Sequence, residues 1–107
     1  MNFEVLILPE AEDDMVDIYR YVVEHDSAGH AEKLLDALER KCSLLNNAPE
    51  REHGVPELIR INVTGFREIH FKPYRIIYQV LGGRAFIHAV LDGRRELQDL
   101  LEKRLIR

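Results

Sequence analysis

The sequence predicts an α+β fold in which all 107 residues form one domain. Two observations carry this prediction. Apolar residues recur at helical spacing through the first half of the chain, and from residue 58 onward they alternate instead with a period of two. Short turn signals separate the later strands, so an antiparallel meander is expected. The apolar stripes of the helices then have to be buried on one face of that sheet.

The N-terminal half is predicted to form one strand and two helices. Residues 3–8 are rich in strand formers and end just before a proline, which suits the first turn of a helix. A helix is therefore expected over 10–25, and a second one over 28–46, where the apolar residues form a single stripe. Ser27 or its neighbour Asp26 can cap the second helix. Because only a few residues separate the two helices, they are predicted to form an antiparallel hairpin.

The second half is predicted to form four strands and a C-terminal helix. Residues 49–57 contain two prolines and a glycine and are expected to be a loop. The strands that follow are expected over 58–63, 66–72, 74–81 and 85–91. A glycine pair between the last two strands is typical of a two-residue hairpin turn. A final helix with a leucine stripe is expected from residue 94 to the end, so the predicted order is βααββββα.

The charges are unevenly distributed along the chain. Apolar residues make up 46% of the sequence, and the net charge is −4 with a pI near 5.7. Residues 1–58 carry 5 basic and 14 acidic side chains, whereas residues 59–107 carry 10 basic and 5 acidic ones. This balance argues against a protein that coats nucleic acid with its whole surface. It leaves room for a basic surface in the C-terminal half.

The targeting and redox features favour a cytoplasmic protein. No apolar run approaches the length of a membrane span, and the N-terminus lacks the pattern of a secretory signal. The single cysteine, Cys42, lies in the apolar stripe of the second helix and is interpreted as a core residue. The five histidines show no metal-ligand spacing, and no phosphate-binding loop or dinucleotide fingerprint is present. Neither a metal nor a cofactor is therefore expected.

Six short motifs follow one another along the chain. They are Leu8-Pro9-Glu10-Ala11-Glu12, Asp17-Ile18-Tyr19-Arg20-Tyr21, Leu45-Asn46-Asn47-Ala48-Pro49, Gly65-Phe66-Arg67, Tyr74-Arg75-Ile76-Ile77-Tyr78 and Ala89-Val90-Leu91-Asp92-Gly93-Arg94-Arg95. In order and spacing they resemble the toxins of the RelE/ParE superfamily from bacterial type II toxin–antitoxin systems. The resemblance implies a growth-inhibiting toxin that a partner antitoxin neutralises. RelE-like members cleave mRNA on the ribosome, whereas ParE-like members inhibit DNA gyrase, so the resemblance leaves the target open.

RNA cleavage without a metal needs a base, an acid and cations that hold the phosphate. If the chain is a nuclease, Arg67 and Arg75 would hold the phosphate, and Tyr78, His70 or His88 would transfer the proton. A structural interpretation stands beside each of these roles. Strand alternation places Tyr78 toward the core and makes His88 a packed histidine.

Glu68 and His70 share one face of their strand, which is interpreted as solvated. Arg67 and Arg75 instead share parity with apolar residues. An arginine at such a position needs a partner or access to water, so either a salt bridge to the acidic helical hairpin or a functional role is expected. Lys72 falls on the same predicted face as Glu68.

The resemblance implies a histidine at the position of Asp92, followed by tyrosine in several nuclease relatives and by glycine in many ParE relatives. An ionised aspartate repels phosphate, and a helix cap accounts for it better than catalysis does. Together with the acidic pI, this favours a ParE-like toxin that binds DNA gyrase. The residues expected to bind the target are Arg67, Arg75, Arg94 and Arg95. The alternatives are a ribosome-dependent mRNA endonuclease and a degenerate toxin that only binds its antitoxin.

The antitoxin is expected to lay an amphipathic segment along apolar positions of the helical hairpin and the C-terminal helix. The candidate positions are Tyr19, Val22, Leu97, Leu101 and Leu105. The resemblance further implies that operator DNA is bound only through the antitoxin complex and that no membrane is involved.

Overall fold

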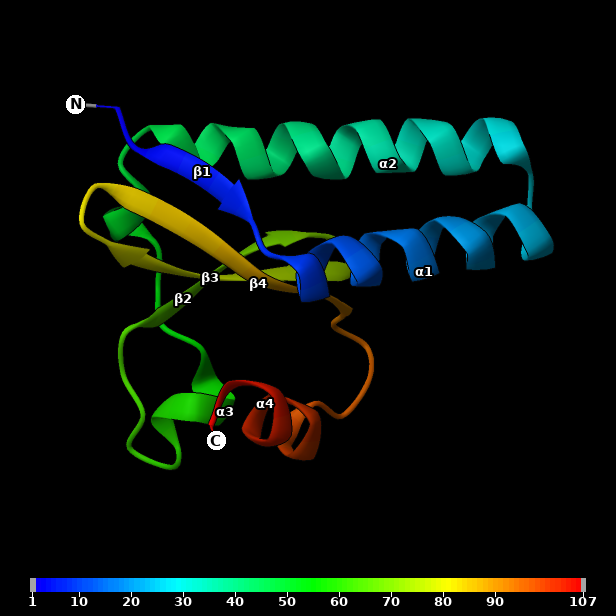
Figure 1. Ribbon diagram of the computed structural model, residues 1–107. Helices are drawn as coiled ribbons and strands as arrows, with labels where there is room; N and C mark the ends of the chain where they lie inside the picture. Colours follow the sequence, from blue (N-terminus) through cyan, green and yellow to red (C-terminus); the bar gives the residue numbers. More distant parts are fainter. Residues whose placement is uncertain (1, 107) are drawn as a thin grey trace.

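The computed structural model describes residues 2–106 and confirms the α+β class. Three layers are stacked, with the sheet between two pairs of helices (Figure 1). The elements are β1 (Glu4–Ile7), α1 (Pro9–His25), α2 (Ala28–Ser43), η1 (Leu44–Asn46), η2 (Pro49–Arg51), α3 (Pro56–Ile59), β2 (Phe66–Phe71), β3 (Tyr74–Leu81), β4 (Arg84–Asp92) and α4 (Gln98–Leu105). The helices α1 and α2 cover one face of the sheet, and α3 and α4 lie on the other (Figure 1).

The sheet has four strands in the order β1-β4-β3-β2 and is mixed. β2, β3 and β4 form an antiparallel meander, while β1 pairs with β4 in parallel. The observed antiparallel meander therefore has three strands, one fewer than the sequence predicted. The helical hairpin and the segment that follows it carry the chain from β1 to β2 at the opposite edge of the sheet, and the meander then returns to place β4 beside β1.

The strand predicted over 58–63 is wrong. Residues 56–59 form the short helix α3 instead, and turns follow it. Pro56 occupies the first helical turn, where its fixed φ is suitable, and Asn62 adopts a left-handed φ of 65°, which no strand accommodates. Leu58 is fully buried, whereas Arg60 and Asn62, which would share its face in a strand, are exposed, so these residues do not have the burial pattern of a pleated strand.

The C-terminal helix begins at Gln98 and not at residue 94. Asp92 does not cap it, which corrects the sequence-based interpretation. The carboxylate of Asp92 accepts a hydrogen bond from the backbone N–H of Arg94, and this local turn precedes the helix. The predicted cap of α2 is confirmed, because the Ser27 hydroxyl accepts the backbone N–H of His30 at 3.1 Å.

The side chains on each face of the sheet build a separate core. The first core lies under the helical hairpin and includes Leu38 and Tyr78, both fully buried. Cys42 belongs to it as predicted, and burial raises the pKa of its thiol to about 11. The second core joins the opposite face to α3 and α4 through Leu58 and Leu101. Among the described helices, none is long and apolar enough to cross a membrane.

A β-bulge in β4 changes which residues of that strand face each core. Ile77 pairs with Ala89 but Tyr78 pairs with Ile87, so His88 is left as the extra residue. The bulge reverses the alternation along the strand, and Val90 joins the first core although simple parity places it with His88. Strand alternation alone could not predict this shift.

We expect Leu38→Ala to lower the free energy of unfolding by about 2–5 kcal/mol, because it leaves a cavity in the first core. Leu44→Ala is the matched control, since Leu44 lies at the end of the same helical segment and is 63% exposed. That control should change stability by no more than about 0.5 kcal/mol. Urea unfolding followed by circular dichroism measures both. Equal losses in the two variants would show that Leu38 does not anchor the core.

Candidate functional site

Arg75 is the centre of a partly buried ion-pair network on the α4 side of the sheet. Its guanidinium donates to both carboxylate oxygens of Glu57 at 2.7 Å. It also donates through Nε to Oε1 of Glu68 at 2.8 Å. The expected salt bridge is present, but its partners come from α3 and β2 and not from the acidic helical hairpin. The hydrogen bonds to Glu57 raise the pKa of Arg75 and lower that of Glu57.

Glu68 is only 2% exposed, so the solvated strand face predicted for it is wrong. The loop before α3 folds over this part of β2 and covers the carboxylate. Its second oxygen, Oε2, lies 2.8 Å from Nε2 of His53 and 3.2 Å from Nε2 of His70. We call His53, Glu57, Glu68, His70 and Arg75 the Glu68 cluster.

Arg67 lies on the opposite face of the sheet from Arg75. Its guanidinium donates to the backbone carbonyl of Glu52 at 2.6 Å and thereby holds the loop that follows α2. The two arginines occupy positions of opposite parity on paired strands, with Arg67 opposite Tyr78 and Arg75 opposite His70. They do not converge on a common ligand.

Arg94 and Arg95 border a groove between α1 and the end of β4, with a volume of about 390 Å³. We call this the α1–β4 groove. Its lining residues are Asp14, Asp17, Ile18, Tyr21, Tyr74, Val90, Leu91, Asp92, Arg94 and Arg95. Arg94 is 74% exposed and forms an ion pair with Asp92 at 2.7 Å. The hydrogen bond from Arg94 holds the pKa of Asp92 below its usual range.

The α1–β4 groove is electrostatically mixed. Two guanidinium groups face three carboxylates along its lining, and Asp92 already neutralises Arg94. Burial raises the pKa of Asp14, while the backbone N–H of Val90 and the guanidinium of Arg104 oppose that rise. A polyphosphate would meet the carboxylates as well as the arginines. The groove therefore suits a polar protein surface better than an RNA backbone.

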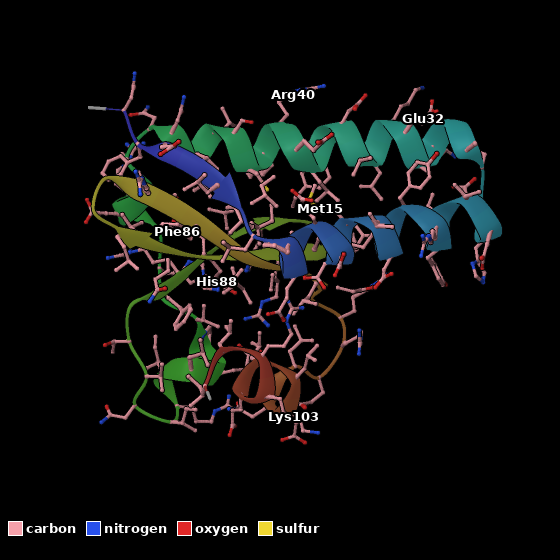
Figure 2. The ribbon with its side chains drawn as sticks, viewed as in Figure 1. Met15, Glu32, Arg40, Phe86, His88 and Lys103 are labelled. Atoms are coloured by element: carbon pink, nitrogen blue, oxygen red, sulfur yellow. The ribbon has the colours of Figure 1, made fainter. Side chains whose placement is uncertain are left out.

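The proton-transfer candidates do not gather at one point. Tyr78 is fully buried in the first core, where its hydroxyl donates to the carbonyl of Pro49 and burial raises its pKa. His88 lies on the side of the sheet that faces α4 (Figure 2), with Nε2 at 3.2 Å from the Gln79 carboxamide oxygen. Burial and the nearby Arg104 lower the pKa of His88. Only His70 and Arg75, both in the Glu68 cluster, lie close together.

The antitoxin-binding candidates divide into buried and accessible positions. Leu97 and Leu101 are buried in the second core, so the expectation of an exposed surface there is wrong. These leucines attach α4 to the sheet. Tyr19 and Val22 on α1 and Leu105 on α4 are half-buried.

Sequence reasoning missed exposed apolar side chains on two sides of α1. Val16 and Val23, 43% and 37% exposed, lie about two turns apart on one side of the helix, whereas Tyr21, 62% exposed, lines the α1–β4 groove. Tyr21 stacks on the ring of His25, with the ring centroids 4.0 Å apart. By contrast, the outer side of α2 presents charged side chains such as Glu32 and Arg40 (Figure 2). The two helices of the hairpin therefore offer different surfaces.

Sequence reasoning also missed two polar clusters. Arg104 of α4 donates to Asp14 of α1 at 2.9 Å and to the carbonyl of His88 at 2.8 Å, and so connects three elements. The second is the set of His53, Glu68 and His70. The only local signal for it is the spacing of Glu68 and His70, which places both side chains on one strand face. The third member comes from a distant loop.

The fold is that of a small α+β domain with a four-stranded mixed sheet between helices. A family model described as the ParE toxin of the type II toxin–antitoxin system parDE matches residues 5–97, and the chain belongs to this family. A solved structure titled "Chromosomal ParDE TA system from P. aeruginosa" has a chain with the same fold. The TM-score is 0.72 at 18% identity, over 84% of this chain and 95% of that chain. No curated protein sequence is significantly similar to this chain.

We expect His88→Gln to flatten the pH dependence of stability between about pH 7 and pH 5. The pKa of His88 is depressed in the folded protein, so the unfolded chain takes up a proton more readily. This contribution to stability is present above the ordinary histidine pKa of 6.5 and is lost as the pH falls through the folded value. The free energy of unfolding, measured in urea at several pH values, tests this.

Leu44→Gln serves as the control for that experiment, because Leu44 is exposed and the substitution adds or removes no ionisable group. The slope of stability against pH in this variant should follow that of the wild type. An unchanged slope in His88→Gln would contradict the assignment of a half-buried neutral imidazole.

Proposed function

We propose that this chain is a growth-inhibiting toxin that acts by binding a protein target, DNA gyrase, and so blocks replication. The observation that carries the proposal is the mixed charge of the α1–β4 groove, where Asp14, Asp17 and Asp92 surround Arg94 and Arg95. A protein surface with both charges can complement such a groove, whereas phosphates are repelled by its carboxylates. Membership of the ParE family supports the same target class.

Arg94 and Arg95 are the residues that we assign to the target interface. Both follow β4 on an exposed turn, and Arg95 lies close enough to Asp92 to affect the pKa of that carboxyl group. Arginine is enriched among the residues that dominate binding energy in protein interfaces. Arg67 and Arg75 were expected to share this role. Their guanidinium groups already bind Glu52, Glu57 and Glu68, so we assign them to holding the loop and α3 in place.

A partner antitoxin is the second element of the proposed function. We propose that it docks an amphipathic segment on α1, where Val16 and Val23 present exposed apolar surface next to Tyr19 and Val22. Operator DNA would then be bound through the antitoxin, and the cytoplasm is the compartment that this proposal requires. The solved structure with the same fold is itself titled as a ParDE system.

We expect the double variant Arg94→Ala/Arg95→Ala to inhibit gyrase supercoiling at least about 30-fold less strongly than the wild type. Loss of an arginine from the centre of an interface costs about 2 kcal/mol or more, which corresponds to that factor in affinity. The control is Lys33→Ala/Arg40→Ala, which removes the same charge from exposed positions on α2. Purified protein and a plasmid supercoiling assay give the readout, with circular dichroism to confirm folding.

Expression in cells without the antitoxin separates the proposal from its alternatives. Under the gyrase proposal, incorporation of labelled thymidine falls before that of labelled methionine. An earlier fall in methionine incorporation, with mRNA cut inside translated codons, would establish the ribosome-dependent nuclease instead. Growth unaffected by intact, accumulated protein would leave only antitoxin binding.

A further inference from the structure

We propose that His53, Glu68 and His70 form a binding site for a divalent transition metal of the zinc class. One ring nitrogen of each histidine and a carboxylate oxygen of Glu68 lie within 4.8 Å of one another. Two imidazoles and one carboxylate are a ligand set that proteins use for Zn²⁺ and related cations. None of these three residues lines the α1–β4 groove, and Glu68 and His70 lie on β2, the edge strand of the meander.

The distances in this cluster are close to those that a metal requires. The two histidine nitrogens lie 2.8 Å and 3.2 Å from Oε2 of Glu68. Ligand atoms of a tetrahedral zinc site are about 3.3 Å apart, given metal–ligand bonds of about 2.0–2.1 Å. His53 and His70 have side chains 58% and 48% exposed, so modest rotations of both imidazoles can make room for the ion.

The backbone holds the two ligand-bearing segments together. The N–H of Glu68 donates to the carbonyl of His53 at 3.1 Å, and Gly54 forms an isolated bridge with Arg67. His70 follows Glu68 by two residues on β2 and therefore presents its ring on the same strand face. The rings of His53 and His70 meet edge to face at 5.6 Å between centroids. The fold thus places His53 beside Glu68 and His70 of β2.

The outer contacts of Glu68 are also those of a metal ligand. Its Oε1 accepts hydrogen bonds from Arg75, and Arg75 is held in turn by Glu57. This leaves Oε2 directed at the two histidines. Hydrogen bonds that fix a ligating carboxylate are a common feature of metal sites and affect affinity strongly.

The local charge favours a cation. Two largely buried carboxylates, Glu57 and Glu68, share the single guanidinium of Arg75. Within residues 2–106, the remaining ion-pair partners of Glu68 are the two histidines. A divalent ion would compensate the excess negative charge, which a low-dielectric environment makes costly. The exposed histidines leave the fourth coordination position open to solvent.

Titration of the tag-free, metal-free full-length chain with ZnCl₂ tests this proposal. Isothermal titration calorimetry should show one Zn²⁺ per chain, and His53→Gln and His70→Gln should each weaken binding at least about tenfold. His30→Gln is the matched control, because His30 is also an exposed histidine, 2.9 Å from the carboxylate of Asp26, but has no second imidazole beside it. MgCl₂ should not bind, since imidazole ligands disfavour Mg²⁺.

Cobalt gives a second readout that does not depend on heats of binding. Co²⁺ bound to the wild type should show visible absorption bands, and these should disappear in both histidine variants but not in His30→Gln. Equal Zn²⁺ affinity in wild type, His53→Gln and His70→Gln would overturn the proposal, as would the absence of a stoichiometric site in the wild type. These measurements use no toxicity readout, so their outcome is separate from that of the gyrase proposal.

Discussion

The attachment of α3 and the loop before it to the sheet depends on the guanidinium of Arg75. It binds Glu57 on α3 and Glu68 on β2 from its own strand, β3, and so joins three elements. An arginine with 13% side-chain exposure would be strongly destabilising without such partners, and the two carboxylates would be equally so without it. The loop over residues 49–57 must therefore fold onto β2 before the network is complete. The leucines of α4 then close the second core over Ile77 and Ala89.

The two faces of the sheet therefore differ in composition. The face under the helical hairpin is apolar and holds Tyr78, Leu38 and Cys42 in a continuous core. The other face combines an apolar half under α4 with a polar half under the loop. Arg104 connects the layers at the far end, through Asp14 of α1 and the carbonyl of His88. Charged groups that look functional in the sequence, such as Arg67 and Arg75, thus hold the loop and α3 on the sheet, whereas Arg94 and Arg95 lie on an exposed turn.

Local patterns in the sequence predicted the parts of the fold that local forces determine. The helical hairpin, the glycine turn between β3 and β4, the core position of Cys42 and the serine cap of α2 are all confirmed. Residues 58–63 were misassigned because Pro56 and Asn62 outweigh their strand-like alternation. The environment of Glu68 could not be predicted, since the chain that buries it lies 15 residues away in sequence. The convergence of His53 with His70 has the same non-local origin.

The bulge at His88 has a consequence for how this chain can change length. Upstream of it, Ile87 faces the first core, and downstream Val90 faces the same core while Ala89 and Leu91 face the second. The backbone N–H of Val90 is also the donor to Asp14, at 2.9 Å, so the spacing fixes where α1 meets the sheet. Deleting His88 itself would leave Ile87, Ala89, Val90 and Leu91 in regular alternation, whereas inserting one residue between Ile87 and Val90 would exchange the inward and outward sets on one side of the insertion. β4 should therefore accept loss of the bulged residue more readily than an insertion.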